Sequence, residues 1–212
     1  MHSDPYRLNP EGMHPEALYA SLTSSVRRLV DVTIRSQSDP DTIVSAKAKI
    51  DAAATELSDA LIPGSFGIEA GSDGRPRAWG NAVIGLRNAL APPLIVHHEA
   101  DGSVWADVVL GAAYEGPPGH VHGGICALLL DHVLGATAHK PGRPAVTGTL
   151  TLRYELGTRL GPLRAEARVD RVEGAKTYAV GHLSTEDGVT VRAEGVFIHP
   201  RQTAVLDTAP PR

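Results

Sequence analysis

Two segments near the N-terminus carry apolar residues at helical spacing. In residues 15–34 these positions form one stripe, made of Leu18, Leu22, Val26, Leu29 and Val30. Asp39 followed by Pro40 is a typical helix start. The helix that it opens carries a second stripe, made of Ile43, Ile50, Ala54, Leu57 and Leu61. The pattern predicts a helical hairpin over residues 15–62, interpreted as a packing or dimer-stabilising appendage, behind a flexible leader at residues 1–14.

Beyond a linker rich in glycine and proline at residues 63–77, the periodicity changes from helical to alternating. Residues 94–110 predict two strands around a turn at Asp101 and Gly102. Four more strand-like segments follow, at residues 145–156, 162–173, 175–184 and 189–199. Because the turns between them are too short for crossover helices, we expect an antiparallel sheet.

The first of these four segments alternates clearly. Its apolar positions are predicted to share one face, and they are Val146, Leu150, Leu152 and Tyr154. The other face is predicted to hold Thr147, Thr149, Thr151 and Arg153.

Between the two groups of strands lies the most apolar segment, GHVHGGICALLLDHVLG, at residues 119–135. A helix that is apolar around most of its circumference must be surrounded by protein. One curved antiparallel sheet wrapped around a long central helix would achieve this. The predicted fold class is therefore α+β, with a main domain at residues 78–199 and a flexible tail at residues 200–212.

Composition narrows the possible partners and compartments. The net charge of −4 comes without a basic run, so nucleic acid is not an expected partner. Cys126 is the single cysteine, which excludes an internal disulfide and fits a reducing cytoplasm. No run is apolar and long enough to span a bilayer, and the N-terminal residues lack the apolar core of a signal peptide. We therefore expect a cytoplasmic protein.

One residue of the central helix needs a chemical explanation. Asp131 lies in sequence among Leu128, Leu129, Leu130 and Val133. A carboxylate in such a setting is costly unless another group pairs with it or a reaction uses it.

The segment HGGICALLLD, with four strands behind it, resembles the hotdog-fold thioesterases of the phenylacetic-acid-degradation type and the related mammalian thioesterase superfamily members. The family's His-Gly-Gly and its Asp nine positions later match His122, Gly123, Gly124 and Asp131. Its Thr or Ser on the next strand matches Thr147, and NALAPPL at residues 88–94 is similar to the family's stretch before the first long strand, although Ala89 stands where many relatives have proline. The resemblance spans residues 78–199 and leaves out the helical hairpin.

This resemblance implies acyl-CoA hydrolysis by a homodimer or a dimer of dimers, with coenzyme A lying along a subunit interface. Coenzyme A would then be part of the substrate, and no separate cofactor is expected.

The residues support this chemistry independently. Free N–H groups at a helix start, here those of Gly123 and Gly124, together with the helix dipole, could stabilise the oxyanion formed from a thioester carbonyl. Asp131 could activate a water molecule or attack the carbonyl itself, and the sequence does not separate these routes. Thr147 is the expected hydrogen-bond partner of Asp131 or of the water, with Thr149 as its rival on the same predicted face.

Spacing along the helix adds a constraint. Seven residues separate Gly124 from Asp131, which corresponds to about 10 Å along a helix axis. Hydrogen bonds reach only about 3 Å. If both groups act on one carbonyl, two antiparallel helices from two subunits must meet at a twofold axis.

Other candidates have supporting roles. His122 is expected to orient the loop or contact substrate, and His120, Ala127 and Arg153 are candidate substrate-binding residues. The arginines that could hold the phosphates of coenzyme A are Arg153, Arg159, Arg164 and Arg192. His97 and His98 are adjacent and point to opposite faces of a strand, and no metal-binding motif is present, so no metal is expected.

Two other functions remain open from the sequence. One is a hotdog-fold enoyl-CoA hydratase, which would need an Asp–His pair after a different motif. The other is a non-catalytic protein that binds acyl-CoA or lipid or uses the hairpin for assembly. Asp131 argues against a pure binder, because binding alone does not need a costly carboxylate.

Overall fold

The structure is a computed structural model that describes residues 15–70, 76–92, 94–139 and 143–200. The predicted leader at residues 1–14 and residues 201–212 of the predicted tail lie outside this part of the chain. Two helices, α1 (Pro15–Arg35) and α2 (Pro40–Ser58), come first, and α2 is capped by Asp39, whose side chain accepts the N–H of Thr42. The helices predicted in residues 15–62 are confirmed.

The main sheet has six antiparallel strands in the order β3-β4-β6-β7-β8-β5. The strands are β3 (His97–His98), β4 (Val104–Leu110), β5 (Val146–Tyr154), β6 (Gly161–Glu173), β7 (Lys176–Thr185) and β8 (Gly188–Ile198). The last four match their predicted ranges closely. The turn at Asp101–Gly102 is confirmed, but β3 has only two residues, so the first strand of that hairpin is shorter than predicted.

Shorter elements complete the described fold. A short 3₁₀ helix, η1 (Ala112–Tyr114), precedes the central helix α3 (Gly123–Ala138). A small second sheet pairs β1 (Glu69–Ala70) with β2 (Pro76–Arg77), at positions where the sequence predicted only a linker.

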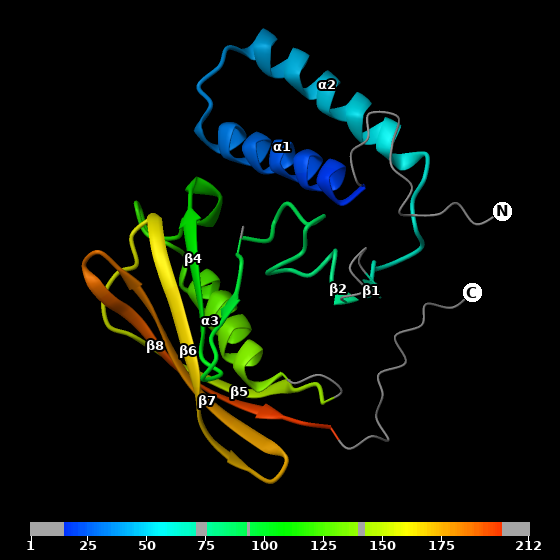
Figure 1. The fold of residues 1–212 in the computed structure, drawn as a ribbon. Coiled ribbons are helices and arrows are strands. Elements are labelled where there is room, and N and C mark those ends of the chain that lie inside the picture. Colours follow the sequence, from blue (N-terminus) through cyan, green and yellow to red (C-terminus); the bar gives the residue numbers. More distant parts are fainter. Residues whose placement is uncertain (1–14, 71–75, 93, 140–142, 201–212) are drawn as a thin grey trace, which may run out of the picture.

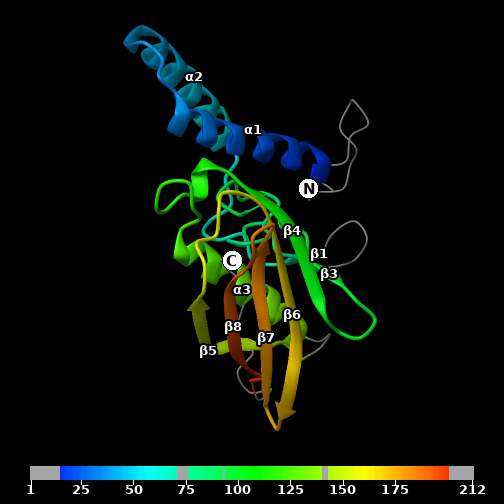
Figure 2. The same cartoon turned by 90° about the vertical axis from the view of Figure 1, so that its left-hand side faces the viewer.

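The central helix packs against one face of the sheet, as Figures 1 and 2 show. Its fully buried side chains include Leu129, Leu130, Val133 and Leu134. Gly181 on β7 permits the close approach, because a Cβ there would lie 2.7 Å from Leu134 Cδ1 and 2.5 Å from the carbonyl oxygen of Glu166. The predicted hotdog arrangement, one antiparallel sheet around one long helix, is confirmed.

One side of α3 nevertheless remains open. Gly124 is exposed, and Ala127 and Asp131 are only partly buried. These three residues are three and four positions apart, so they share one helix face. The helix is therefore not enclosed by its own sheet, contrary to the expectation from its apolar sequence.

The first helix is attached to the main domain by polar and aromatic contacts. Arg27 donates from Nε to the carbonyl oxygen of Ala91 and from Nη2 to that of Asn88, both at 3.2 Å. The guanidinium of Arg87 lies 3.4 Å from the ring centre of Tyr19. Figures 1 and 2 show α2 farther from the sheet than α1, and no residue of α2 is buried. The helical segment is thus fixed through α1.

Candidate functional site

A tight loop leads into the start of α3. The N–H of Gly116 donates to the carbonyl oxygen of His120, and Glu115 accepts the N–H of Gly119 at 2.7 Å. A Cβ on Gly116 would lie 2.7 Å from the Cα of His122, so only glycine fits there without a shift of the backbone. This loop fixes where His122 and the first helical turn lie.

His122 is the N-cap of α3. Its Nδ1 accepts the N–H of Gly124 at 3.0 Å, so the neutral ring carries its proton on Nε2. The structure therefore gives His122 a structural role, as the cap of α3. The N–H of Gly123, in contrast, has no acceptor among the described residues. Of the two predicted oxyanion donors, Gly123 is therefore the one whose N–H is free to donate a hydrogen bond to a substrate.

Tyr154 was not singled out from the sequence, yet it contacts this helix start. Its hydroxyl donates to the carbonyl oxygen of Gly123 at 2.9 Å, and burial raises the pKa of that hydroxyl. The same peptide unit contains the N–H of Gly124, which donates to His122. Tyr154, the Gly123–Gly124 peptide and His122 thus form one chain of hydrogen bonds, in which each bond polarises the next.

At the other end of the open face, Asp131 is held by Thr147. Thr147 Oγ1 donates to Asp131 Oδ1 at 2.8 Å. The contact predicted from the sequence is present, although Asp131 is partly rather than fully buried. A charge-assisted hydrogen bond of this kind keeps the carboxylate in one orientation.

Thr149 does not face Asp131, and the predicted alternation of this strand is wrong at one point. The pairing of β5 with β8 shifts between Thr147 and Thr149, so Gly148 is the extra residue of a β-bulge. Thr147 pairs with Phe197, which is buried under α3, whereas Thr149 pairs with Val196 on the opposite face of the sheet. Val146 likewise falls on the face of Thr149, Thr151 and Arg153.

Of the remaining predicted residues, one lies on the open face of α3 and the others lie outside it. Ala127 lies on the open face between Gly124 and Asp131. His120 lies in the loop before α3, where its Nδ1 is 2.9 Å from the carbonyl oxygen of Pro118. Arg153 is on the outer face of β5, opposite Arg192.

Of the four candidate arginines, three form ion pairs. Arg159 pairs with Asp187, Arg164 with Asp107 and Arg192 with Glu155. Among the described residues, Arg153 has no ion-pair partner.

His132 was also not singled out from the sequence. Burial lowers the pKa of this histidine, and the neighbouring carboxylate of Asp131 offsets part of that effect. This lowered pKa beside Asp131 results from the packing of α3, which the sequence pattern does not show.

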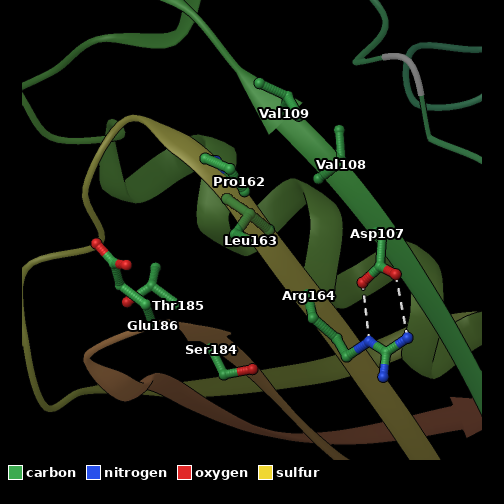
Figure 3. Close-up of a pocket in the computed structure, with 9 residues that line it drawn as sticks. All are labelled: Asp107, Val108, Val109, Pro162, Leu163, Arg164, Ser184, Thr185 and Glu186. Carbon is green, nitrogen blue, oxygen red and sulfur yellow. Dashed lines mark hydrogen bonds and ion pairs between the residues drawn. The ribbon is translucent and has the colours of Figure 1, made fainter.

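The outer face of the sheet carries a separate pocket of about 540 Å³ between β4, β6 and β7. Figure 3 shows its lining, including Arg164, which donates from Nε and Nη2 to the two carboxylate oxygens of Asp107 at 2.8 and 3.1 Å. Of the residues singled out from the sequence, only the candidate arginine Arg164 lines this pocket. In the described ranges there is also no cluster of three or more His, Cys, Asp or Glu side chains that could hold a metal ion, and no helix long and apolar enough to cross a bilayer.

Comparison with known proteins supports the resemblance. The family model described as thioesterase superfamily matches residues 118–192, which include His122, Asp131, Thr147 and Tyr154. Acyl-coenzyme A thioesterase THEM5 of Homo sapiens is 30% identical over 91 residues, which cover 42% of this chain and 37% of that protein. Its Mus musculus counterpart is 28% identical over 136 residues, covering 63% and 55%. The chain thus spans about half or less of the length of these relatives.

A solved structure of a thioesterase superfamily protein is similar over most of the chain. It has a TM-score of 0.76 and 35% sequence identity, and the match covers 85% of this chain and 90% of that one. The covered share exceeds what residues 78–199 contribute, so the similarity extends into the helical segment. By this match and by the fold, the chain belongs to the thioesterase superfamily.

Proposed function

We propose that this protein hydrolyses an acyl-CoA thioester to the free acid and coenzyme A, and that each active site is shared by two subunits. The observation that carries the proposal is the open face of α3. A carboxylate oriented by Thr147 lies on this face, and at its N-terminal end is the unoccupied N–H of Gly123. The relatives that are named acyl-coenzyme A thioesterases agree with this chemistry.

The two groups serve different atoms of the reaction. The N–H of Gly123 and the helix dipole stabilise the negative oxygen that develops when the thioester carbonyl is attacked. The carboxylate of Asp131 takes a proton from the attacking water. The carbon–sulfur bond then breaks, and the thiolate of coenzyme A leaves and is protonated. If Asp131 attacks directly instead, an anhydride forms and water hydrolyses it in a second step.

The distance between Asp131 and the start of α3 is the reason for proposing that two subunits pair. Asp131 lies about 10 Å from Gly124 and about 12 Å from Gly123 along the axis of α3, which is too far for Asp131 and either glycine of one chain to act on one carbonyl. The open face of α3 borders β5, which is an edge strand of the sheet. An edge strand presents unpaired N–H and C=O groups that can join a second copy. Two copies related by a twofold axis would bring each Asp131 to the other's Gly123.

The unpaired Arg153 fits a role with the phosphates of coenzyme A, because it lies on β5 close to the proposed subunit boundary. The other three candidate arginines would first have to give up a carboxylate partner.

The test is release of thiol from a panel of CoA esters by the wild-type protein and by Asp131→Asn. We expect hydrolysis of at least one ester and a loss of about a hundredfold in the variant, the scale of a removed general base. Asp107→Asn is the matched control, since it makes the same change on the outer face of the sheet. A fully active Asp131→Asn variant would refute the assigned site. A wild-type protein that binds coenzyme A but hydrolyses no ester would favour the non-catalytic binder.

A further inference from the structure

The second helix presents an apolar surface that nothing in the described chain covers. All of its residues are exposed, including Ile43 at 56%, Ile50 at 40% and Leu57 at 52%. A surface helix normally buries such a stripe against its own domain. Here α1 and α2 instead border an open groove of about 760 Å³. Its apolar lining comes from both helices: Leu29 and Val32 of α1, and Ile43, Ala46 and Ile50 of α2.

The apolar positions of α2 follow a seven-residue repeat. Ile43, Ile50 and Leu57 are seven residues apart, and an alanine follows each of them by three positions, at Ala46, Ala53 and Ala60. This is the spacing of a coiled-coil seam, with large side chains at one position and alanines at the other. The helix itself ends at Ser58, so Ala60 lies in the turn beyond it. We refer to these six residues as the α2 seam.

The α2 seam is complementary to itself in antiparallel orientation. With the twofold axis between Asp51 and Ala52, Ile50 lies opposite Ala53 of the second copy. In the same register, Leu57 lies opposite Ala46, and Ile43 opposite Ala60. Every layer then pairs one large side chain with one alanine, which avoids both voids and overpacking. A parallel pairing would instead stack alanine on alanine in every second layer.

The charges beside the seam favour the same arrangement. Lys49 and Glu56 are seven residues apart, too far for contact along one helix. In the antiparallel register, Lys49 lies near Glu56 of the second copy, and the twofold axis creates this pair twice. Neither residue has an ion-pair partner among the described residues, whereas Lys47 pairs with Asp51 on its own helix.

The places of Lys47 and Lys49 relative to α1 help to distinguish two arrangements. In one, α2 pairs with α2 of a second copy, and in the other, α2 packs onto α1 of its own chain. Lys47 lines the groove next to α1, whereas Lys49 lies on the other flank of the seam. Lys49 therefore lies outside the groove that borders α1, where it is open to a second α2. Leu29 and Val32 of α1 would contact that second helix from within the groove.

We propose that the α2 seam is a docking surface for α2 of a second copy of this chain, in antiparallel orientation. This contact is separate from the shared active site and does not depend on the thioesterase activity.

The test uses charge reversal in the full chain. In an assembly of two identical variant chains, either substitution, Lys49→Glu or Glu56→Lys, puts like charges at positions 49 and 56 of both intermolecular pairs. A mixture of the two variants instead restores an opposite-charge pair at both places. We expect native mass spectrometry of the mixture to show mixed assemblies in about threefold excess over random exchange, a modest factor because exposed ion pairs are weak. The double variant Lys49→Glu/Glu56→Lys should assemble like the wild type.

Asp59→Lys is the matched control, because it also replaces an acid by lysine near the end of α2 but away from the seam. Mixed with Lys49→Glu, it should give a smaller excess than Glu56→Lys does. Random exchange in the mixture of Lys49→Glu and Glu56→Lys, or no association at all, would overturn the proposal and favour closure of α2 onto α1 or another partner. Thioester hydrolysis by each variant reports separately on the active site, and we expect it to be unchanged.

Discussion

Gly123 offers a way to remove one N–H group with little other change. It is the first residue of α3, a position that accepts proline, and His122 before it has φ −60° and ψ 134°, the extended conformation that proline requires of its predecessor. Gly123→Pro therefore deletes the proposed oxyanion donor within an intact helix start. We expect its kcat for CoA-ester hydrolysis to be about a hundredfold below that of Gly123→Ala.

Gly123→Ala is the proper reference because it adds a Cβ at the same place and keeps the N–H. That Cβ would meet Tyr154 at 3.4–3.5 Å, an ordinary contact. Equal rates for the two variants would mean that the N–H of Gly123 does not contact the reacting oxygen. Circular dichroism of both proteins would show whether the helix is retained.

The sequence predicted part of this site well, and the failures have a physical cause. The spacing of His122, Gly123 and Asp131 on one helix follows from the chain alone, as does a nearby threonine. The sequence does not reveal which face of the sheet Thr149 occupies, because one inserted residue, Gly148, reverses the alternation of the strand. The contact of Tyr154 with Gly123 depends on how β5 lies beside α3, which periodicity does not encode.

Among the elements, α3 shows the limit of such predictions most clearly. Its apolar composition correctly predicted a central helix against a sheet. However, an apolar surface can be covered by the same chain or by another copy, and the two cases give the same sequence pattern. The open face with Gly124, Ala127 and Asp131, like the uncovered seam of α2, was therefore visible only in the structure.

The partly buried His132 of α3 predicts how the free energy of unfolding depends on pH. Because burial lowers the pKa of His132 below its usual 6.5, the unfolded chain binds a proton there before the folded protein does. Its contribution to stability is complete above about pH 6.5 and decreases as the pH falls toward the lowered value. We expect the free energy of unfolding of His132→Gln to decrease less than that of the wild type between pH 7 and 5, as measured by urea denaturation.

The control for this prediction is His98→Gln, which removes an exposed histidine on β3. It should leave the pH dependence of the wild type in place. If His132→Gln and the wild type lose stability in parallel, protonation of His132 is not coupled to unfolding.

For the whole molecule, β5 links the two halves of the proposed site. Thr147 near one end of this edge strand holds Asp131, and Tyr154 at the other end contacts Gly123. The surface through which a second copy would pair thus carries both the carboxylate of Asp131 and the proposed oxyanion donor, Gly123. Association and catalysis should then be inseparable, and subunit mixing can test this.

Asp131→Asn and Gly123→Pro are each expected to be nearly inactive as pure proteins. Co-expressed with different affinity tags and purified through both, they form mixed dimers. In a shared-site dimer, one site then receives both substitutions and the other receives neither, so activity should return to about half that of the wild-type dimer. If each site lay within a single chain, every chain would keep its own defect and the mixed dimer would remain as inactive as its parents. Thiol release by the doubly purified protein therefore decides whether two copies of α3 build one active site.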